Sequence, residues 1–143
     1  MSHVSGLQRF LEAQGPIYTQ ALDELRRGAK RSHWMWFIFP QIAGLGHSPT
    51  ARFYEIANRA EAEAYLAHPL LCSRLLECTQ AMLMHTEKSA HSILGSPDDL
   101  KFRSCMTLFD ATSEPDSEKG SLFSRALQQF YDGRPDEATL SRL

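Results

Sequence analysis

Apolar residues recur every three or four positions along most of this chain, which is the spacing that places them on one face of an α-helix. The clearest row consists of Tyr18, Ala21, Leu22 and Leu25. A longer row runs through Leu71, Leu75, Cys78 and Met82. No stretch alternates between apolar and polar residues for long enough to predict a β-strand. The pattern therefore predicts an all-α protein.

Capping residues, prolines and glycines mark the ends of these helices. The run Ser5-Gly6-Leu7-Gln8 has the form of a capping box. Ser48-Pro49 and Ser96-Pro97-Asp98-Asp99 each combine a capping residue with a proline, which predicts a helix N-terminus. Gly28 is placed to end the second helix, and His68-Pro69 separates a short helix from the longest one.

Two segments have no helical spacing. Residues 33–39 are apolar without a clean period, so this stretch is either a buried strand or a buried helical turn, and Pro40 ends it. Residues 113–120 are polar and contain a proline, which predicts a surface loop. Taken together, the elements predict a single all-α domain over residues 1–143, an irregular or orthogonal bundle of about seven to eight helices joined by short loops.

The composition narrows the class of protein. Apolar residues make up 43% of the chain and charged residues 22%, which is typical of a globular domain. The net charge of −2 argues against a general nucleic-acid binder, which requires a basic excess. No apolar run reaches the roughly 18 residues of a membrane span. Residues 1–5 do not have the pattern of a secretory signal, so a cytoplasmic location is expected.

The three cysteines also favour a reducing compartment. Cys72, Cys78 and Cys105 are odd in number and form no Cys-x-x-Cys pair. We expect them to pack as small hydrophobic residues.

The densest group of large side chains follows a group of cations. It is the run Lys30-Arg31-Ser32-His33-Trp34-Met35-Trp36-Phe37-Ile38-Phe39-Pro40-Gln41. One interpretation is that this block is purely core, since aromatic residues dominate core packing. The other is that Trp34 and Phe37 pack inward while His33, Trp36 and Gln41 form the edge of a pocket. An aromatic wall beside cations suits a planar ring that carries negative charge, such as a nucleotide.

Each remaining candidate group also has two interpretations. Lys30 and Arg31 either end a solvated helix or hold a phosphate or carboxylate. Gly44-Leu45-Gly46 before Ser48 is either an anion-binding loop or a plain turn and helix cap. The polar residues around Lys101 either form a network that ties helices together or take part in catalysis.

The histidines predict no metal site, because none of them has metal-ligand spacing. His33 is the best candidate for a general base, since apolar neighbours can desolvate it and shift its pKa. A hydrogen-bonded structural histidine is the alternative for this position.

The chain also resembles a known family. The motifs that carry the resemblance are the block at 30–41, Gly44-Leu45-Gly46, Glu61-Ala62 through His68-Pro69, Lys101-Phe102-Arg103-Ser104 with Met106-Thr107-Leu108-Phe109, and Asp136. The family is a bacterial domain of unknown function, DUF1810, often labelled calpastatin. That label conflicts with the composition, because calpastatin-type segments are disordered until they bind, whereas this chain supports a packed core. Cys72-Ser73 and Cys105 depart from the glycine-containing pair and the serine that the family pattern has there. The resemblance implies an all-helical fold and no established activity.

The sequence therefore yields one functional hypothesis with two rivals. The hypothesis is that the protein binds a small anionic, nucleotide-like ligand in a cleft between the 30–41 block, the glycine loop and the helix after Ser96. The predicted ligand-binding residues are Lys30, Arg31, Ser32, Trp36, Gln41, Ser48 and Lys101. The rivals are a hydrolase of a nucleotide or ADP-ribose derivative, with His33 as general base, and a protein-interaction adaptor. No cofactor is predicted, and the sequence does not give the oligomeric state.

Overall fold

The computed structural model describes residues 6–143, and these residues form ten α-helices. The helices are α1 (Gln8–Gln14), α2 (Tyr18–Arg27), α3 (Met35–Ile38), α4 (Pro49–Tyr54), α5 (Arg59–Ala67), α6 (Pro69–Leu83), α7 (Ala90–Leu94), α8 (Asp98–Thr112), α9 (Glu118–Tyr131) and α10 (Glu137–Leu140). The described residues contain no β-strand, so the all-α prediction is confirmed.

The expected number of helices, seven to eight, was too low. The elements that the sequence did not define as helices are α3 and α10, each of which has only four residues. A helix of one turn does not contain a full repeat of the apolar spacing, so the pattern cannot reveal it.

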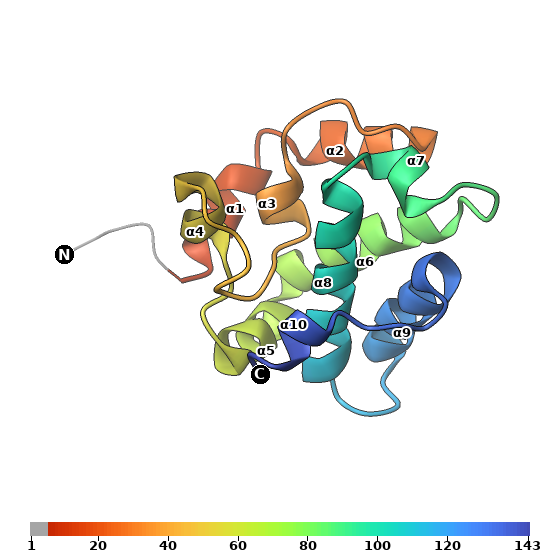
Figure 1. The fold of residues 1–143 in the computed structure, drawn as a ribbon. Helices are drawn as coiled ribbons and strands as arrows, with labels where there is room; N and C mark the ends of the chain where they lie inside the picture. Colours follow the sequence, from red (N-terminus) through yellow and green to blue (C-terminus); the bar gives the residue numbers. More distant parts are fainter. Residues whose placement is uncertain (1–5) are drawn as a thin grey trace.

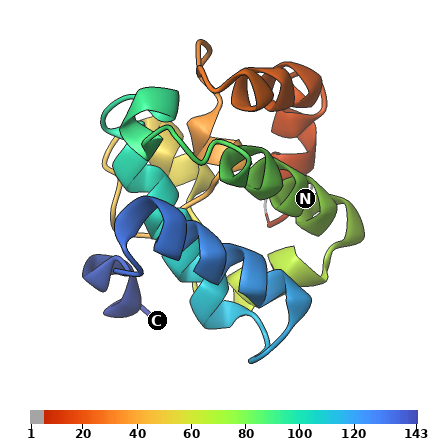
Figure 2. The same ribbon diagram turned by 90° about the vertical axis from the view of Figure 1, so that its right-hand side faces the viewer.

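Helix α8 runs through the middle of the molecule, and the other helices gather around it (Figure 1). It packs against α5, α7, α9 and α10. Its side chains are therefore buried on more than one side, and Phe102, Cys105, Met106, Leu108 and Phe109 are all completely buried. Helix α9 lies beside α8 and also contacts α6, which is visible from the side in Figure 2.

The ambiguous segment 33–39 is resolved as a buried helical turn. Trp34 is completely buried, and Met35, Ile38 and Phe39 are each no more than 2% exposed. Phe39 meets Phe102 of α8 edge to face, with 4.8 Å between the ring centroids. The chain after Pro40 then forms an isolated parallel bridge between Ile42 and Ile56, in which the Ile56 amide donates to the Gln41 carbonyl at 2.8 Å.

Most of the predicted helix boundaries agree with the structure. Ser48 caps α4, and Gly28 ends α2 in the left-handed conformation at φ 73°. His68 does more than precede the proline, because its Nδ1 accepts from the Leu71 amide and caps α6. Cys72, Cys78 and Cys105 are buried free thiols, and burial raises the pKa of all three. No helix within residues 6–143 is long and apolar enough to cross a membrane.

Two predicted helix starts differ from the structure, and a third lies partly outside the described residues. Ser96 does not cap α8, because the N-cap position is Pro97 and the helix begins one residue later. Helix α9 begins at Glu118, inside the segment predicted as loop, because the Ser117 hydroxyl accepts from the Gly120 amide and caps it. Ser5, the first residue of the expected capping box, lies outside the described residues. Helix α1 itself has no side-chain cap.

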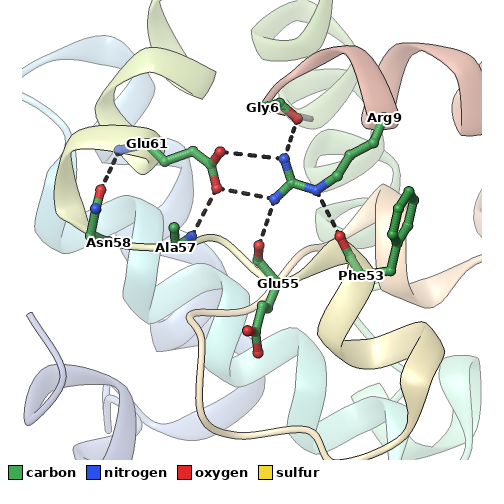
Figure 3. Close-up of polar contacts among 7 residues, drawn as sticks. All are labelled: Gly6, Arg9, Phe53, Glu55, Ala57, Asn58 and Glu61. Atoms are coloured by element: carbon green, nitrogen blue, oxygen red, sulfur yellow. Dashed lines mark hydrogen bonds and ion pairs between the residues drawn. The ribbon is translucent and has the colours of Figure 1, made fainter. Parts of the chain in front are cut away.

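A buried arginine fastens α1 to α4, to α5 and to the segment between them (Figure 3). Arg9 is 7% exposed, and its guanidinium donates to the carbonyls of Gly6, Phe53 and Glu55. It also donates to both carboxylate oxygens of Glu61, at 3.0 and 3.3 Å. Burial favours a raised pKa for Glu61, but the Arg9 hydrogen bonds and the Ala57 amide outweigh it and lower the pKa. All five guanidinium N–H groups thus have an acceptor.

We predict that Arg9→Lys lowers the free energy of unfolding by about 3 to 5 kcal/mol. An ammonium offers three donors instead of five, so at least two of the oxygens that the guanidinium satisfies lose their partner. Urea denaturation followed by circular dichroism measures the change. The exposed Arg52→Lys on α4 is the matched control, with an expected change within about 0.5 kcal/mol. Equal losses in the two variants would show that the buried network contributes nothing special.

Candidate functional site

Three of the predicted ligand-binding residues line one surface depression, which we call the Trp36 depression. Trp36 comes from α3, Gln41 from the segment after it, and Lys101 from α8. The rest of the lining consists of Met35, Phe39, Ile42, Gly46, Ala51, Tyr54 and Glu55. The enclosed volume is about 10 Å³. This is room for about one water molecule, so a larger ligand has to lie on the surface of the depression.

Lys101 is the cation of the depression. Its Nζ lies 5.5 Å from the centroid of the Trp36 ring, within the range of a cation–π interaction. Its other neighbour is Asp98, one helical turn earlier, at 3.7 Å. That distance is longer than the roughly 2.7 to 2.9 Å of a charge-assisted hydrogen bond, so Asp98 holds the ammonium only weakly.

Lys30 is close to this group but is already paired. Its Nζ lies 2.8 Å from the second oxygen of Asp98 and 5.1 Å from the centroid of the Trp34 ring. The side chain is only 9% exposed, against 26% for Lys101. Asp98 thus lies between two lysines and pairs closely with one of them. The local charge that is left uncompensated belongs mainly to Lys101.

A carboxylate faces the depression as well. Glu55 lines it, and its Oε1 accepts from the amide of Gly44 at 3.3 Å. Gly44 has φ 99°, a conformation that favours glycine, and this brings its amide to the carboxylate. The depression therefore offers an ammonium, a carboxylate and the Gln41 amide around an aromatic surface.

The segment that leads into α3 is fixed by Glu24, a residue that the sequence analysis did not single out. Glu24 Oε1 accepts from the amides of Arg31 and Ser32 and from the Trp34 indole, at 2.8, 3.0 and 2.9 Å. Its Oε2 accepts from the Ser32 hydroxyl at 2.6 Å. The side chain of Gln20 donates to Oε2 as well, at 3.1 Å.

These bonds control the ionisation of Glu24. The residue is 6% exposed, and burial alone favours a raised pKa. The hydrogen bonds to Ser32, Arg31, Gln20 and Trp34 outweigh burial and lower the pKa to about 2. Glu24 therefore stays ionised in the folded protein at all ordinary pH values.

The remaining predicted residues do not reach the lining. Arg31 and His33 are exposed on the segment before α3. The hydroxyl of Ser32 is engaged by Glu24, and that of Ser48 accepts from the Ala51 amide at 3.1 Å as the cap of α4. The expected convergence of the whole 30–41 block on one cleft is thus only partial, because Trp36 and Gln41 line the depression whereas Lys30 to His33 do not.

The polar residues that follow Lys101 on α8 form a structural network. The Ser104 hydroxyl donates to Asp136 at 2.9 Å, and the Asp136 amide donates to the Thr107 hydroxyl at 2.8 Å. Arg103 donates to the carbonyls of Arg134 and Pro135. These contacts tie the C-terminal segment to α8 and leave Lys101 as the member of the row that faces the depression.

The sequence contains an indication for two further residues, Glu24 and Asp98, that the predictions did not take into account. Glu24 follows Ala21 by three positions and precedes Leu25, so a carboxylate lies on the apolar face of a helix. A charge in such a position predicts a buried partner. Asp98 was interpreted only as part of a helix N-terminus, although a lysine three residues later is within reach on the same face. Residues 6–143 contain no group of three or more His, Cys, Asp or Glu side chains that could hold a metal ion.

Comparison with known proteins agrees with the resemblance found in the sequence. A family model described as protein of unknown function (DUF1810) matches residues 4–143. Among solved structures, the crystal structure of the conserved hypothetical protein Rv1873 from Mycobacterium tuberculosis is 45% identical in sequence, with a TM-score of 0.90. The match covers 96% of this chain and 95% of that one. A search of curated proteins gave no match.

We predict that Glu24→Gln lowers the free energy of unfolding by about 2 to 3 kcal/mol at pH 7, because an amide carries no charge and its nitrogen cannot accept. The lowered pKa means that the folded state releases this proton more readily than the unfolded state. The stabilisation is therefore complete above about pH 5 and declines as the pH falls toward 2. Denaturation of both proteins at several pH values measures the difference between them.

The exposed Glu12→Gln on α1 is the control for Glu24→Gln, and its difference from wild type should stay small at every pH. A difference for Glu24→Gln that did not shrink in acid would contradict the assigned ionisation.

Proposed function

This chain belongs to the family described as protein of unknown function (DUF1810), and we propose that it binds a small anionic, nucleotide-like ligand at the Trp36 depression. One observation carries the proposal. Trp36, Gln41 and Lys101 arrive from separate segments and meet around one aromatic surface. A ring face, an amide and a weakly held cation are the groups that recognise a base and an acidic tail.

The size of the depression determines how the ligand lies. A volume of about 10 Å³ cannot enclose a base. The base therefore stacks on the partly exposed ring of Trp36, and its polar edge meets Gln41 and the free oxygen of Glu55. Stacking of a base on an aromatic side chain contributes about 1 to 3 kcal/mol, so it can anchor a ligand without an enclosed pocket.

The anionic group of the ligand binds Lys101. The 3.7 Å contact with Asp98 is easily replaced by a shorter bond to a phosphate or carboxylate. Lys30 contributes indirectly, because its 2.8 Å pair with Asp98 neutralises the carboxylate that otherwise repels an anion.

Binding is preferred to hydrolysis as the proposal. His33 is exposed and lies outside the lining of the depression, so no geometric observation favours it as a general base for a ligand bound there.

We predict that isothermal titration calorimetry detects binding of AMP, ADP or ADP-ribose, and that Lys101→Gln weakens it by about tenfold or more. Arg125→Gln removes the same charge from the exposed face of α9 and should leave the affinity within about twofold. Adenosine and inorganic phosphate, titrated separately, report the contributions of the ring and of the anion. Absence of heat with all five compounds at about 5 mM, with folded protein, would end the proposal.

Tryptophan fluorescence gives an independent prediction. Trp34 is completely buried, whereas Trp36 is partly exposed. A base that stacks on Trp36 quenches its emission, so wild type should show quenching that saturates with the calorimetric affinity. Trp36→Phe retains a stacking surface but leaves only the buried indole, and its emission should not respond to the ligand. Quenching that persists in Trp36→Phe would place the ligand elsewhere.

A further inference from the structure

A second hollow surface lies at the other end of α8, away from the Trp36 depression. One cleft there, of about 560 Å³, is formed by the end of α5, the segment after α8 and the first turn of α9. An adjoining cleft of about 660 Å³ runs along α6. The two share Leu66, Ala67 and Lys119, so they form one continuous feature, which we call the α5–α9 groove.

The groove is long. Along its α6 side the lining extends from Pro69 to Gln80, which is three turns of helix. At 1.5 Å per residue this is about 16 Å, the length of a three-turn helical segment of a partner. A small compact ligand fills only part of such a feature.

The floor of the groove is apolar. Leu66 and Cys72 line it and are 7% and 4% exposed, and Leu76 of α6 is partly buried beside them. A partner therefore has to present apolar side chains to the floor, which excludes a purely hydrophilic polycation as the best fit.

The rim of the groove is acidic. Glu63, Glu114 and Glu118 line the first cleft and are exposed. The single cation there, Lys119, directs its Nζ to the carbonyl of Leu66 at 3.5 Å, at the negative end of the α5 dipole. Glu63 is partly compensated by Arg59, whose guanidinium lies 3.9 Å from its carboxylate, so the negative excess of the rim comes mainly from Glu114 and Glu118 against Lys119. Glu77 does not add to it, because it pairs with Arg26 and accepts from Tyr18.

We propose that the α5–α9 groove docks a basic amphipathic helix of another protein. The apolar face of that helix packs on Leu66, Cys72 and Leu76, and its lysines or arginines meet Glu63, Glu114 and Glu118. A helix in a groove is a recurring mode of recognition, in which apolar anchors give affinity and rim charges give orientation and rate. An acidic rim repels nucleic acid and acidic peptides, so the charge selects the partner.

The test uses a fluorescein-labelled 14-residue helical peptide of leucine and lysine, with the leucines at helical spacing. Fluorescence anisotropy with wild-type protein should give a Kd below about 100 µM that weakens as salt is raised. The triple variant Glu63→Gln, Glu114→Gln, Glu118→Gln should weaken binding by about tenfold or more. The matched control Glu12→Gln, Glu87→Gln, Glu137→Gln removes three exposed carboxylates elsewhere and should stay within about twofold.

Two further probes identify the kind of occupant. A peptide with serine in place of leucine keeps the charge and should bind at least about fivefold more weakly, because it loses the apolar anchors. Spermine should not displace the labelled peptide from the groove, even at a concentration at which the peptide itself saturates the protein. Absence of peptide binding at about 1 mM, equal weakening in the two triple variants, or equal binding of the serine peptide or spermine would each overturn the proposal. Glu63 pairs with Arg59 at 3.9 Å, whereas the other five substituted carboxylates form no ion pair within residues 6–143, and thermal melts check that each variant is folded.

Discussion

The geometry of the Trp36 depression depends first on one buried carboxylate, that of Glu24. Glu24 accepts from five groups, and four of them, two backbone amides, a hydroxyl and the indole N–H, belong to the segment from Arg31 to Trp34 and fix its path, while the fifth is the side chain of Gln20 on α2. That path sends the ring of Trp34 into the core and brings Trp36, two residues later, to the surface beside Lys101. A carboxylate is well suited to this role because it only accepts, and every group around it donates.

The opposite wall of the depression is held by a buried cation, the guanidinium of Arg9, where the first wall is held by a buried carboxylate. Arg9 donates through all of its N–H groups, to the carbonyls of Gly6, Phe53 and Glu55 and to the carboxylate of Glu61 (Figure 3). A guanidinium in the core only donates, so it organises carbonyl oxygens as Glu24 organises amides. Glu24 fixes the segment that leads to Trp36, and Arg9 fixes the segment around Tyr54. Both Trp36 and Tyr54 line the depression.

The fold could be predicted from the sequence wherever one residue decides one local feature. Gly28 ends a helix because its left-handed conformation suits glycine, and Ser48 caps a helix because its hydroxyl reaches a free amide two or three residues later. The site could be predicted only in part, because its geometry depends on distant partners. In the sequence, Lys30 and Lys101 are equivalent candidates for binding an anion. In the structure Asp98 lies between them, forms a close ion pair with Lys30 and holds Lys101 only weakly. No spacing rule links residue 30 to residue 98.

The two candidate surfaces share α8 but have opposite character. Near the start of α8, Lys101 presents a cation beside an exposed aromatic ring, whereas beyond its end the groove presents carboxylates around an apolar floor. Lys101 and Thr112 stand eleven residues apart on a helix that packs against four others. A rigid element of this kind keeps the two surfaces at a fixed distance, so an anion at one end and a basic segment at the other do not compete for the same charges. The fold therefore permits the Trp36 depression and the α5–α9 groove to be occupied at the same time, so ligand binding at the first and docking of a partner at the second are independent.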